Sequence, residues 1–301
     1  MKATLIANPG AGKMASRDHL TEVIHVLEGN GWDVDVRHSR GRGDATRIAR
    51  EAVARGDDVV IVAGGDGTIN EAVQALAGSE TALGFIPYGT VNVWAREIGL
   101  PLSPREAALS LTSGRIETLD LGIANDRYFL LMAGIGFDGE VVRRARRVER
   151  FKHRFGILPY MAVTLATATL YRGVDVELRY DGVIRRVQAL MLVLGNTRLY
   201  GGRFRFTPDA VATDGWLDLC IVKGRGPIAL ARQALPLLIE GSTAFSDVET
   251  IRVRELIVRG NGPAPLQLDG ELTGSTPAHF RVARRALRVI VPAEFDSELI
   301  A

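Results

Sequence analysis

The first 120 residues alternate between short apolar runs and stretches in which apolar residues recur at helical spacing. The runs predict strands, and the spacing, as at Leu20, Val23, Ile24 and Leu27, predicts helices. Strands are expected at Ala3–Ala7, Trp32–Arg37, Val59–Ala63 and Leu83–Ile86, and helices at Arg17–Glu28, Asp44–Arg55 and from Thr68 onward. Repeated strand–helix units predict a parallel sheet with helices on both faces.

The pattern changes after about Leu121, where strand-like runs predominate and the turn signal Asp181-Gly182 predicts a hairpin. Strands are expected at Val174–Tyr180, Ile184–Leu194, Arg203–Thr207, Trp216–Val222, Glu249–Val258, Gln267–Leu268, Phe280–Val282 and Leu287–Val291. Only two helical stretches, Leu158–Tyr171 and Pro227–Ile239, interrupt them. We therefore expect an α/β domain over residues 1–121, a β-sandwich over 122–291, and a tail, 292–301, that packs back on the first domain.

A phosphate-binding turn is the first sign of chemistry. Gly64-Gly-Asp-Gly-Thr68 follows a short β-branched run and precedes a helix. Glycines let the backbone turn sharply and leave its N–H groups uncovered, and a helix N-terminus favours anions. Asp66 would repel phosphate unless a divalent cation or an acceptor's proton lies between them. A purely structural glycine turn is the alternative interpretation.

Two other strands end in turn residues, at Asn8–Gly12 and Pro87–Thr90. Ligands of parallel sheets bind at the carboxyl ends of the strands. The three turns are therefore expected to converge on one site.

Composition narrows the class of protein. The 301 residues are 47% hydrophobic and 24% charged, which is typical of a globular protein. The net charge of +2 predicts no general binding of polyanions, so no nucleic-acid partner is expected. Cys220 is the single cysteine, which excludes an internal disulfide. The uncharged stretch Phe155–Tyr171 is shorter than the ~20 residues of a membrane span. We expect a cytoplasmic protein that can still touch the inner face of a membrane.

Six segments, in order, resemble the soluble bacterial diacylglycerol kinase-like lipid kinases, which share a catalytic core with sphingosine and ceramide kinases. They are Asn8-Pro-Gly-Ala-Gly12, Gly64-Gly-Asp-Gly-Thr-Ile-Asn-Glu71, Pro87-Tyr-Gly-Thr-Val-Asn92, Gly134-Ile-Gly-Phe-Asp138, Asp214-Gly-Trp-Leu-Asp218 and Asp269-Gly-Glu271. NAD kinases share the second segment, whereas the last two look like the lipid kinases. The resemblance implies an N-terminal three-layer α/β nucleotide domain, a C-terminal β-sandwich and an active site in the cleft between them.

The resemblance also implies roles for particular residues. ATP would bind at Asn8, Pro9, Gly10, Ala11, Gly12, Ser39, Gly65, Asp66, Gly67, Thr68, Ile69, Asn70, Glu71 and Thr90. Glu271 would be the general base, and Asp66 would act through metal or charge beside the phosphates. A structural Mg²⁺ would be held by the side chain of Asp214 and the carbonyls of Val211 and Trp216, since this cation prefers oxygen ligands.

The chain departs from the family at two of these positions. Ser39 stands where relatives often have threonine, which keeps a hydroxyl. Val93 stands where many have an aspartate that is thought to serve the active site. The loss of that carboxylate predicts lower activity or a shift of its role to Asp66 and Asn92.

Two carboxylates compete for the role of base. By itself, Leu268-Asp-Gly-Glu-Leu-Thr273 predicts a β-turn with two solvated carboxylates. Spacing does not separate Asp269 from Glu271.

Other polar residues carry weaker signals. Lys13 lacks P-loop spacing, the five histidines lack metal-ligand spacing, and Gly134–Asp138 is interpreted as a close-packing turn that follows a strand and lines the cleft. The basic segment Arg143–Arg154 fits a solvated helix face, contact with an anionic membrane or, least well, nucleic-acid binding.

The sequence is therefore interpreted as an ATP- and Mg²⁺-dependent kinase for the hydroxyl of a membrane lipid, with diacylglycerol as the first candidate. An NAD or other small-molecule kinase, and a catalytically weak lipid- or nucleotide-binding protein, are the alternatives. Homodimer formation is left open.

Overall fold

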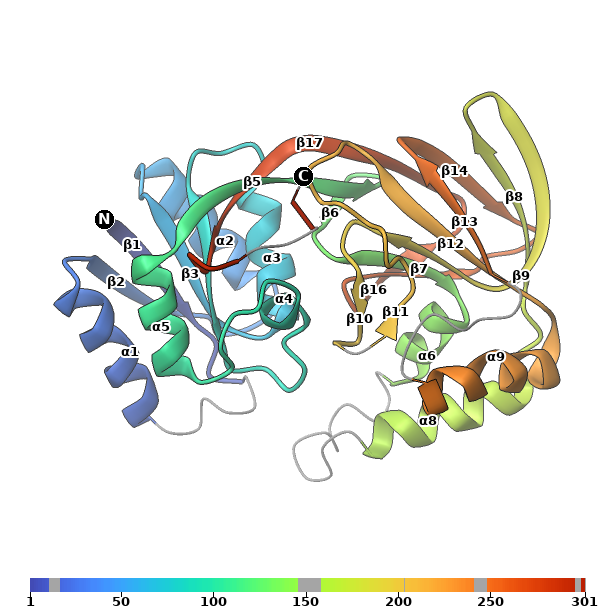
Figure 1. Ribbon diagram of the computed structural model, residues 1–301, viewed down its shortest axis with the longest axis horizontal. Coiled ribbons are helices and arrows are strands. Elements are labelled where there is room, and N and C mark those ends of the chain that lie inside the picture. The colour runs from blue at the N-terminus through green and yellow to red at the C-terminus, as the bar shows by residue number, and fades with distance from the viewer. Residues whose placement is uncertain (11–16, 146–157, 203, 241–247, 296–298, 301) are drawn as a thin grey trace. The chain divides into compact units, whose positions relative to one another are not determined.

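The computed structural model places the chain in two compact units (Figure 1). It describes all residues except 11–16, 146–157, 203, 241–247, 296–298 and 301. The first unit contains Met1–Leu121, Val211–Gly215 and Ala283–Ala301, and the second contains Gly122–Ala210 and Trp216–Val282. The predicted second domain, residues 122–291, thus includes two segments that belong to the first unit.

The first unit is built on a parallel sheet in the order β2-β1-β3-β4. The strands are β1 (Lys2–Ala7), β2 (Asp33–His38), β3 (Val59–Gly64) and β4 (Ala82–Pro87). β3 is buried along its whole length, which explains its continuous apolar sequence. The end of β17 (Ala278–Val291) extends the sheet through the parallel pair Val289 and Leu83, and β5 (Arg115–Ala124) pairs with β17.

Helices cover both faces of this sheet (Figure 1). α1 (Arg17–Gly29) packs against α5 (Pro104–Ser113) on one face, and α2 (Asp44–Ala54) packs against α3 (Asp66–Leu76) on the other. The predicted three-layer α/β class is confirmed.

Three details of the first unit differ from the sequence-based expectations. α3 begins at Asp66, two residues earlier than predicted, because Gly65 already serves as its N-cap. α4 (Val93–Glu97) and α5 were not predicted. For α5 a signal was present, since Ser103 is its N-cap and Pro104 occupies its first turn.

The second unit is an antiparallel β structure in which β9 (Val183–Gly195) is central. β9 pairs with β7 (Met132–Gly136), β8 (Val174–Tyr180) and β12 (Leu217–Lys223). The remaining strands are β6 (Arg127–Phe129), β10 (Leu199–Tyr200), β11 (Phe204–Arg205), β13 (Val248–Val253), β14 (Glu255–Gly260), β15 (Pro265–Leu268) and β16 (Glu271–Ser275). Their inward side chains, such as Phe129, Leu192, Leu219 and Phe280, form one core, which confirms the predicted sandwich class.

The second unit contains more helix than predicted. α6 (Phe137–Ala145) joins α8 (Leu158–Leu170) and α9 (Gly226–Glu240), of which only the last two were expected. The predicted strand Glu249–Val258 is two strands that break at Arg254. The two runs predicted near the C-terminus are one strand, β17, whose polar stretch Ala283–Ala286 looked like a break. Part of the predicted strand Arg203–Thr207 lies outside the described residues, and β11 covers its centre.

An ion-pair cluster on the second unit predicts a dependence of stability on pH. Hydrogen bonds from Arg185 and then Lys223 lower the pKa of Glu249 from 4.5 to about 2. Because the folded-state pKa is depressed, this stabilisation is fully present above about pH 4.5 and is lost as the pH falls towards 2. Glu249→Gln should therefore lower the free energy of unfolding at pH 6, and the deficit should vanish near pH 2. Urea unfolding across this range, with the exposed Glu28→Gln as control, measures it. A deficit independent of pH would contradict the assignment.

Candidate functional site

The predicted convergence of loops in the first unit is present at the carboxyl ends of its parallel strands. The N–H of Asn8 donates to the carbonyl of Ala63 at 3.0 Å, and the N–H of Ser39 donates to that of Ala7 at 2.9 Å. The N–H groups of Tyr88 and Gly89 donate to the carbonyl of Gly64 at 2.8 and 2.9 Å. The loops after β1, β2, β3 and β4 are therefore tied together at one edge.

Asn8 is fixed at this edge by its own side chain. Its Nδ2 donates to Oγ1 of Thr68 at 2.8 Å, and its Oδ1 accepts from the N–H of Gly10 at 3.0 Å. Thr68 is only 7% exposed, whereas Pro9 and Gly10 are exposed. Asn8, Pro9 and Gly10, which follow β1, thus form a loop anchored on α3. The predicted continuation of this loop, Ala11 and Gly12, lies outside the described residues, as does Lys13.

Two glycines bring the β3–α3 and β4–α4 turns into close contact. A Cβ on Gly65 would lie 3.2 Å from Cα of Gly89, and a Cβ on Gly89 would lie 2.8 Å from Cα of Gly65. Asn92 closes the second turn in the left-handed conformation, and its Nδ2 donates to the carbonyl of Gly89 at 3.0 Å. Gly65 and Gly67 leave the α3 N-terminus without bulky side chains, at the end of a helix that attracts anions.

Asp66 performs a structural task that the sequence did not reveal. Its Oδ2 accepts from the N–H of Val93 at 3.0 Å, and its Oδ1 accepts from that of Trp94 at 3.1 Å. The carboxylate therefore caps α4 from 27 residues away. Val93, the residue without the family's carboxylate, is 9% exposed. An aspartate at this position would place a second negative charge beside Asp66.

The other predicted nucleotide contacts fall into three groups. Ser39 is 8% exposed at the loop edge, and Thr90 is exposed on the β4–α4 turn. The side chains of Ile69 and Asn70 are buried, at 2% and 0% exposure. Glu71 instead caps α2, since its carboxylate accepts from the N–H groups of Gly43 at 2.9 Å and Ala45 at 3.3 Å. The structure thus gathers Asn8, Ser39 and Gly65 and gives Glu71 a supporting task.

In the second unit, Glu271 opens β16 directly after a tight turn. Asp269 and Gly270 both have positive φ, 49° and 85°, and Leu268 pairs with Glu271, so two residues connect β15 to β16. Such turns match the twist of a β-hairpin. The turn was predicted, but β16 was not.

Asp269 is not a solvated carboxylate, contrary to the interpretation of the segment taken alone. Its two oxygens accept from the N–H groups of Leu130, Leu131 and Met132, each at 2.9 Å. Its own N–H donates to the carbonyl of Met132 at 2.9 Å. Asp269 therefore ties the hairpin turn to the start of β7.

Glu271 has a different environment. Its side chain is 24% exposed, and its Oε2 lies 3.6 Å from Nη2 of Arg127. A partly exposed carboxylate beside a cation is accessible to a substrate. The Glu271 carboxylate is thus partly exposed, whereas the oxygens of Asp269 are engaged by backbone N–H groups.

A buried network supports the turn that carries Glu271. Asp138, at the start of α6, accepts from Nε2 of Gln267 at 2.6 Å and from the hydroxyl of Tyr200. Oε1 of Gln267 accepts from the N–H of Gly270 at 2.6 Å. Burial raises the pKa of Asp138. Gly134 makes room for this network, because a Cβ there would overlap the Asp138 carboxylate.

The Gly134–Asp138 segment therefore differs from its interpretation as a turn after a strand. Gly134 and Gly136 lie in β7, and α6 begins immediately at Phe137. The expected close packing is present. The hydrogen bonds to Gln267 and Tyr200 had no sequence signal.

The described end of the basic segment Arg143–Arg154 is ion-paired. Glu140 binds Nη2 of Arg143 and Nε of Arg144, both at 2.6 Å. Residues 146–154 lie outside the described residues. The membrane interpretation of this segment stays a prediction.

The segment that contains two of the predicted Mg²⁺ ligands is held by Asp120, which sequence reasoning missed. Asp120 is fully buried; its Oδ2 accepts from the N–H of Gly215 and its Oδ1 from that of Arg285, both at 2.6 Å. The N–H of Asp120 donates to the carbonyl of Ala212 at 2.7 Å. These bonds fix the backbone around Val211 and Asp214.

The donor chemistry of this segment fits a hard cation. Asp214 supplies a half-buried carboxylate, and the carbonyl of Val211 accepts from the N–H of Asp214 at a long distance, 3.5 Å. Trp216 would add its carbonyl two residues further along. All three donors are oxygens, which is the set that Mg²⁺ prefers.

Comparisons with known proteins decide the family. Residues 2–124 match the diacylglycerol kinase catalytic domain, and residues 132–291 match the YegS C-terminal NAD kinase beta sandwich-like domain. The chain belongs to the bacterial diacylglycerol kinase and YegS-like lipid kinase family. Membership of this family implies kinase activity and the use of ATP.

Relatives of this family match the chain over nearly its whole length. A diacylglycerol kinase of Bacillus subtilis (strain 168) is 31% identical over 99% of both chains. One of Mycobacterium tuberculosis (strain H37Rv) is 35% identical over 97% of this chain and 95% of its own. The crystal structure of a diacylglycerol kinase from Bacillus anthracis str. Sterne has a TM-score of 0.76 at 25% identity and covers 98% of both chains.

Proposed function

We propose that this protein transfers the γ-phosphoryl group of ATP to the hydroxyl of a membrane lipid, with diacylglycerol as the first acceptor to test. The observation that carries the proposal is the open glycine turn at the N-terminus of α3, where the loops after β1, β2 and β4 also meet. Full-length relatives named diacylglycerol kinase support the choice of acceptor.

The nucleotide is proposed to lie on the loops gathered at the edge of the parallel sheet. Gly65 and Gly67 allow the phosphates to approach the backbone N–H groups in the first turn of α3, at the end of the helix that attracts anions. Asn8, fixed by Thr68, shapes the loop beside them. Phosphoryl transfer depends mainly on positioning and on stabilisation of charge, and such backbone donors supply both.

Glu271 is proposed as the general base that takes the proton of the lipid hydroxyl. Its partly exposed carboxylate contrasts with that of Asp269, whose oxygens hold three backbone N–H groups. Asp66 is proposed to act beside the phosphates and, through its bonds to Val93 and Trp94, to hold α4 in place.

Mg²⁺ is proposed to be held by the carboxylate of Asp214 and the carbonyls of Val211 and Trp216. When bound there, it would stabilise the backbone of this segment. Asp120 holds the backbone at Ala212 and Gly215, next to two of these residues.

One assay compares the proposed function with its alternatives. Purified protein is incubated with γ-labelled ATP and either diacylglycerol in mixed micelles or NAD. We expect label in the lipid fraction alone. Labelled NADP would favour the small-molecule kinase. No transfer to either acceptor, with ATP still bound, would favour a binding protein and would agree with the missing carboxylate at Val93.

A substitution in the α3 turn tests the nucleotide site. Gly67→Val places a β-branched side chain over the first turn of the helix and should lower ATP affinity at least about tenfold, since the phosphates lose their approach to the backbone. Titration calorimetry measures this. Ala75→Val, further along the same helix, serves as control. A folded Gly67 variant with unchanged ATP affinity would rule out this site.

Removal of the metal tests the proposed Mg²⁺ ligands. Thermal melting in Mg²⁺ should give a higher Tm than melting in a chelator, because an ion that binds only the folded state stabilises it. Asp214→Ala should abolish that difference. Identical melting of the parent protein in both conditions would show that the segment binds no structural Mg²⁺.

A further inference from the structure

α8 presents an apolar face to its surroundings. No residue of Leu158–Leu170 is charged. Exposed side chains recur at helical spacing at Ala162, Leu165, Ala166, Thr169 and Leu170, and the two leucines are each 70% exposed. A surface helix normally turns polar side chains to water.

The opposite side of α8 carries a polar side chain that faces inward. Thr167 is fully buried, and its hydroxyl donates to the carbonyl of Val163 at 2.7 Å. A polar side chain that is satisfied within its own helix thus faces inward, while two leucines face outward.

α9 extends this face. It packs on α8, and the two helices lie side by side (Figure 1). Ile228 in its first turn is 84% exposed, whereas Leu230 is 7% exposed. The adjoining helix ends also meet, because a Cβ on Gly173 would lie 3.3 Å from the carbonyl oxygen of Gly224. Leu170 and Ile228 therefore belong to the same end of the helix pair.

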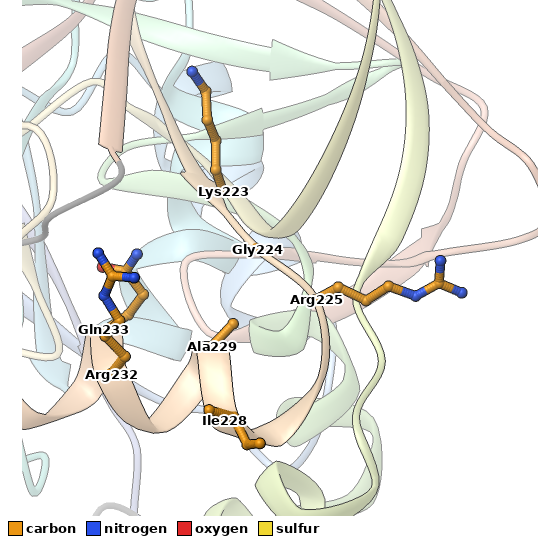
Figure 2. Close-up of a pocket in the computed structure, with 7 residues that line it drawn as sticks. All are labelled: Lys223, Gly224, Arg225, Ile228, Ala229, Arg232 and Gln233. Carbon is orange, nitrogen blue, oxygen red and sulfur yellow. The ribbon is translucent and has the colours of Figure 1, made fainter.

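Basic residues border the apolar side chains. Arg172 lies two residues after the end of α8, Arg225 directly precedes α9, and both are exposed. A pocket of about 430 Å³ lies at the start of α9, and Arg225, Ile228 and Arg232 are among the residues that line it (Figure 2). Lys223, also in its wall, pairs with Glu249 at 2.8 Å. Neither α8 nor residues 226–239 of α9 contain an acidic side chain.

We propose that this α8–α9 face, made of Leu165, Leu170 and Ile228 with Arg172 and Arg225, docks on the surface of an anionic lipid bilayer. Exposed apolar side chains combined with bordering cations fit an interface that is apolar below and negatively charged at its headgroups. Among the described residues, no helix is long and apolar enough to cross a membrane, so the helices would lie along its surface. This surface goes beyond the proposed function, because it binds the membrane and not the reacting lipid.

The charge pattern decides between a membrane and a second copy of the chain. Neither α8 nor residues 226–239 of α9 contain an acidic side chain that a second copy of this face could set against Arg172 and Arg225. Lipid phosphates instead attract them. We therefore commit to the bilayer as the occupant.

Sedimentation with vesicles, in the absence of ATP, tests this proposal. The full-length protein is mixed with vesicles of phosphatidylcholine alone or with phosphatidylglycerol added. The parent should bind the mixed vesicles more tightly, and salt should weaken that binding. Leu165→Ser with Leu170→Ser should lower the partition coefficient at least about tenfold on both kinds of vesicle, because two leucines leave the lipid.

Substitution of the bordering arginines should affect vesicle binding differently from substitution of the leucines. Arg172→Gln and Arg225→Gln should each lower binding about fivefold on phosphatidylglycerol vesicles and change it little on phosphatidylcholine. Ile184→Ser is the matched control, because Ile184 is 62% exposed on β9 of the same unit but away from α8 and α9. Its binding should equal that of the parent.

Several results would overturn the proposal. A parent that binds neither vesicle, or a folded double-leucine variant that binds as well as the parent, would exclude docking by this face. A variant that dissociates a dimer in analytical ultracentrifugation while vesicle binding is unchanged would assign the face to a contact between copies. Thermal melting of each variant verifies its fold.

The outcome is separable from that of the proposed function. Phosphorylation of a short-chain diacylglycerol in detergent micelles reports the kinase without a bilayer. Activity there, with vesicle binding unaffected by the leucine substitutions, would remove only the docking face. Face-dependent binding without any transfer would remove only the proposed kinase reaction.

Discussion

Replacing Glu271 with glutamine should lower the turnover of lipid phosphorylation by at least about 10²-fold while leaving ATP affinity nearly unchanged. Glutamine keeps the shape of the side chain and its place at the start of β16 but cannot accept the proton of the acceptor hydroxyl. A positioned general base commonly contributes about 10²–10⁴-fold. Steady-state kinetics with a fixed micellar diacylglycerol concentration measures the effect.

Asp269→Asn is the informative comparison, because its expected effect lies mainly in stability. An amide keeps one acceptor oxygen but turns an N–H group towards the N–H donors of Leu130, Leu131 and Met132. The unsatisfied bond should cost about 1–3 kcal/mol of the free energy of unfolding. An inactive, folded Asp269 variant beside an active Glu271 variant would show that the base was assigned to the wrong carboxylate.

Replacing Asp120 with alanine should destabilise the protein by roughly 3–6 kcal/mol. The substitution leaves the buried N–H groups of Gly215 and Arg285 without the carboxylate that now accepts from both at 2.6 Å, and a hydrogen bond to a charged group is worth about 1.5–3 kcal/mol. Arg285 has a positive φ of 49°, so the carboxylate also stabilises a backbone conformation that is unfavourable for a residue with a side chain. Urea unfolding of the parent and variant measures the loss.

Asp126→Ala is the control for Asp120, since Asp126 is an exposed aspartate close along the chain. Its free energy of unfolding should be that of the parent within about 0.5 kcal/mol. A similar small change for Asp120→Ala would contradict the proposed anchoring of the Val211–Gly215 segment. Loss of the Mg²⁺-dependent shift in Tm in a mildly destabilised Asp120→Asn variant would link this anchor to the proposed ion.

The elements predicted best were those whose signal lies within a few neighbouring residues. Val59–Gly64 is apolar throughout because both faces of the parallel sheet are covered, and Asp181-Gly182 adopts the positive φ that its composition favours. α5 was not predicted, although Ser103-Pro104 is a sequence signal for the start of a helix. β17 was divided because Arg284 and Arg285 interrupt its apolar run, whereas the N–H of Arg285 is held by the distant Asp120.

In the candidate site, too, local signals were predicted and long-range contacts were not. Sequence patterns indicated the glycine turn before α3, the turn before Glu271 and the importance of Gly134–Asp138. They did not separate Asp269 from Glu271, because a carboxylate's partners decide whether it is structural or reactive. Nor did they show that Glu71 caps α2 or that Asp66 caps α4, since these four hydrogen bonds join residues 26–28 positions apart.

The sequence by itself determined the α/β and β-sandwich classes and the glycine turns, because hydrophobic periodicity and backbone freedom are local properties of the chain. The family was indicated by the resemblance of six ordered segments. Only the tertiary structure decided which carboxylates are engaged: Asp120 reaches Gly215 and Arg285 across 95 and 165 residues, and Asp269 reaches Leu130 across 139. It also decided that Leu165 and Leu170 of α8 face outward. Such partners are set by packing between distant segments, which no local pattern encodes.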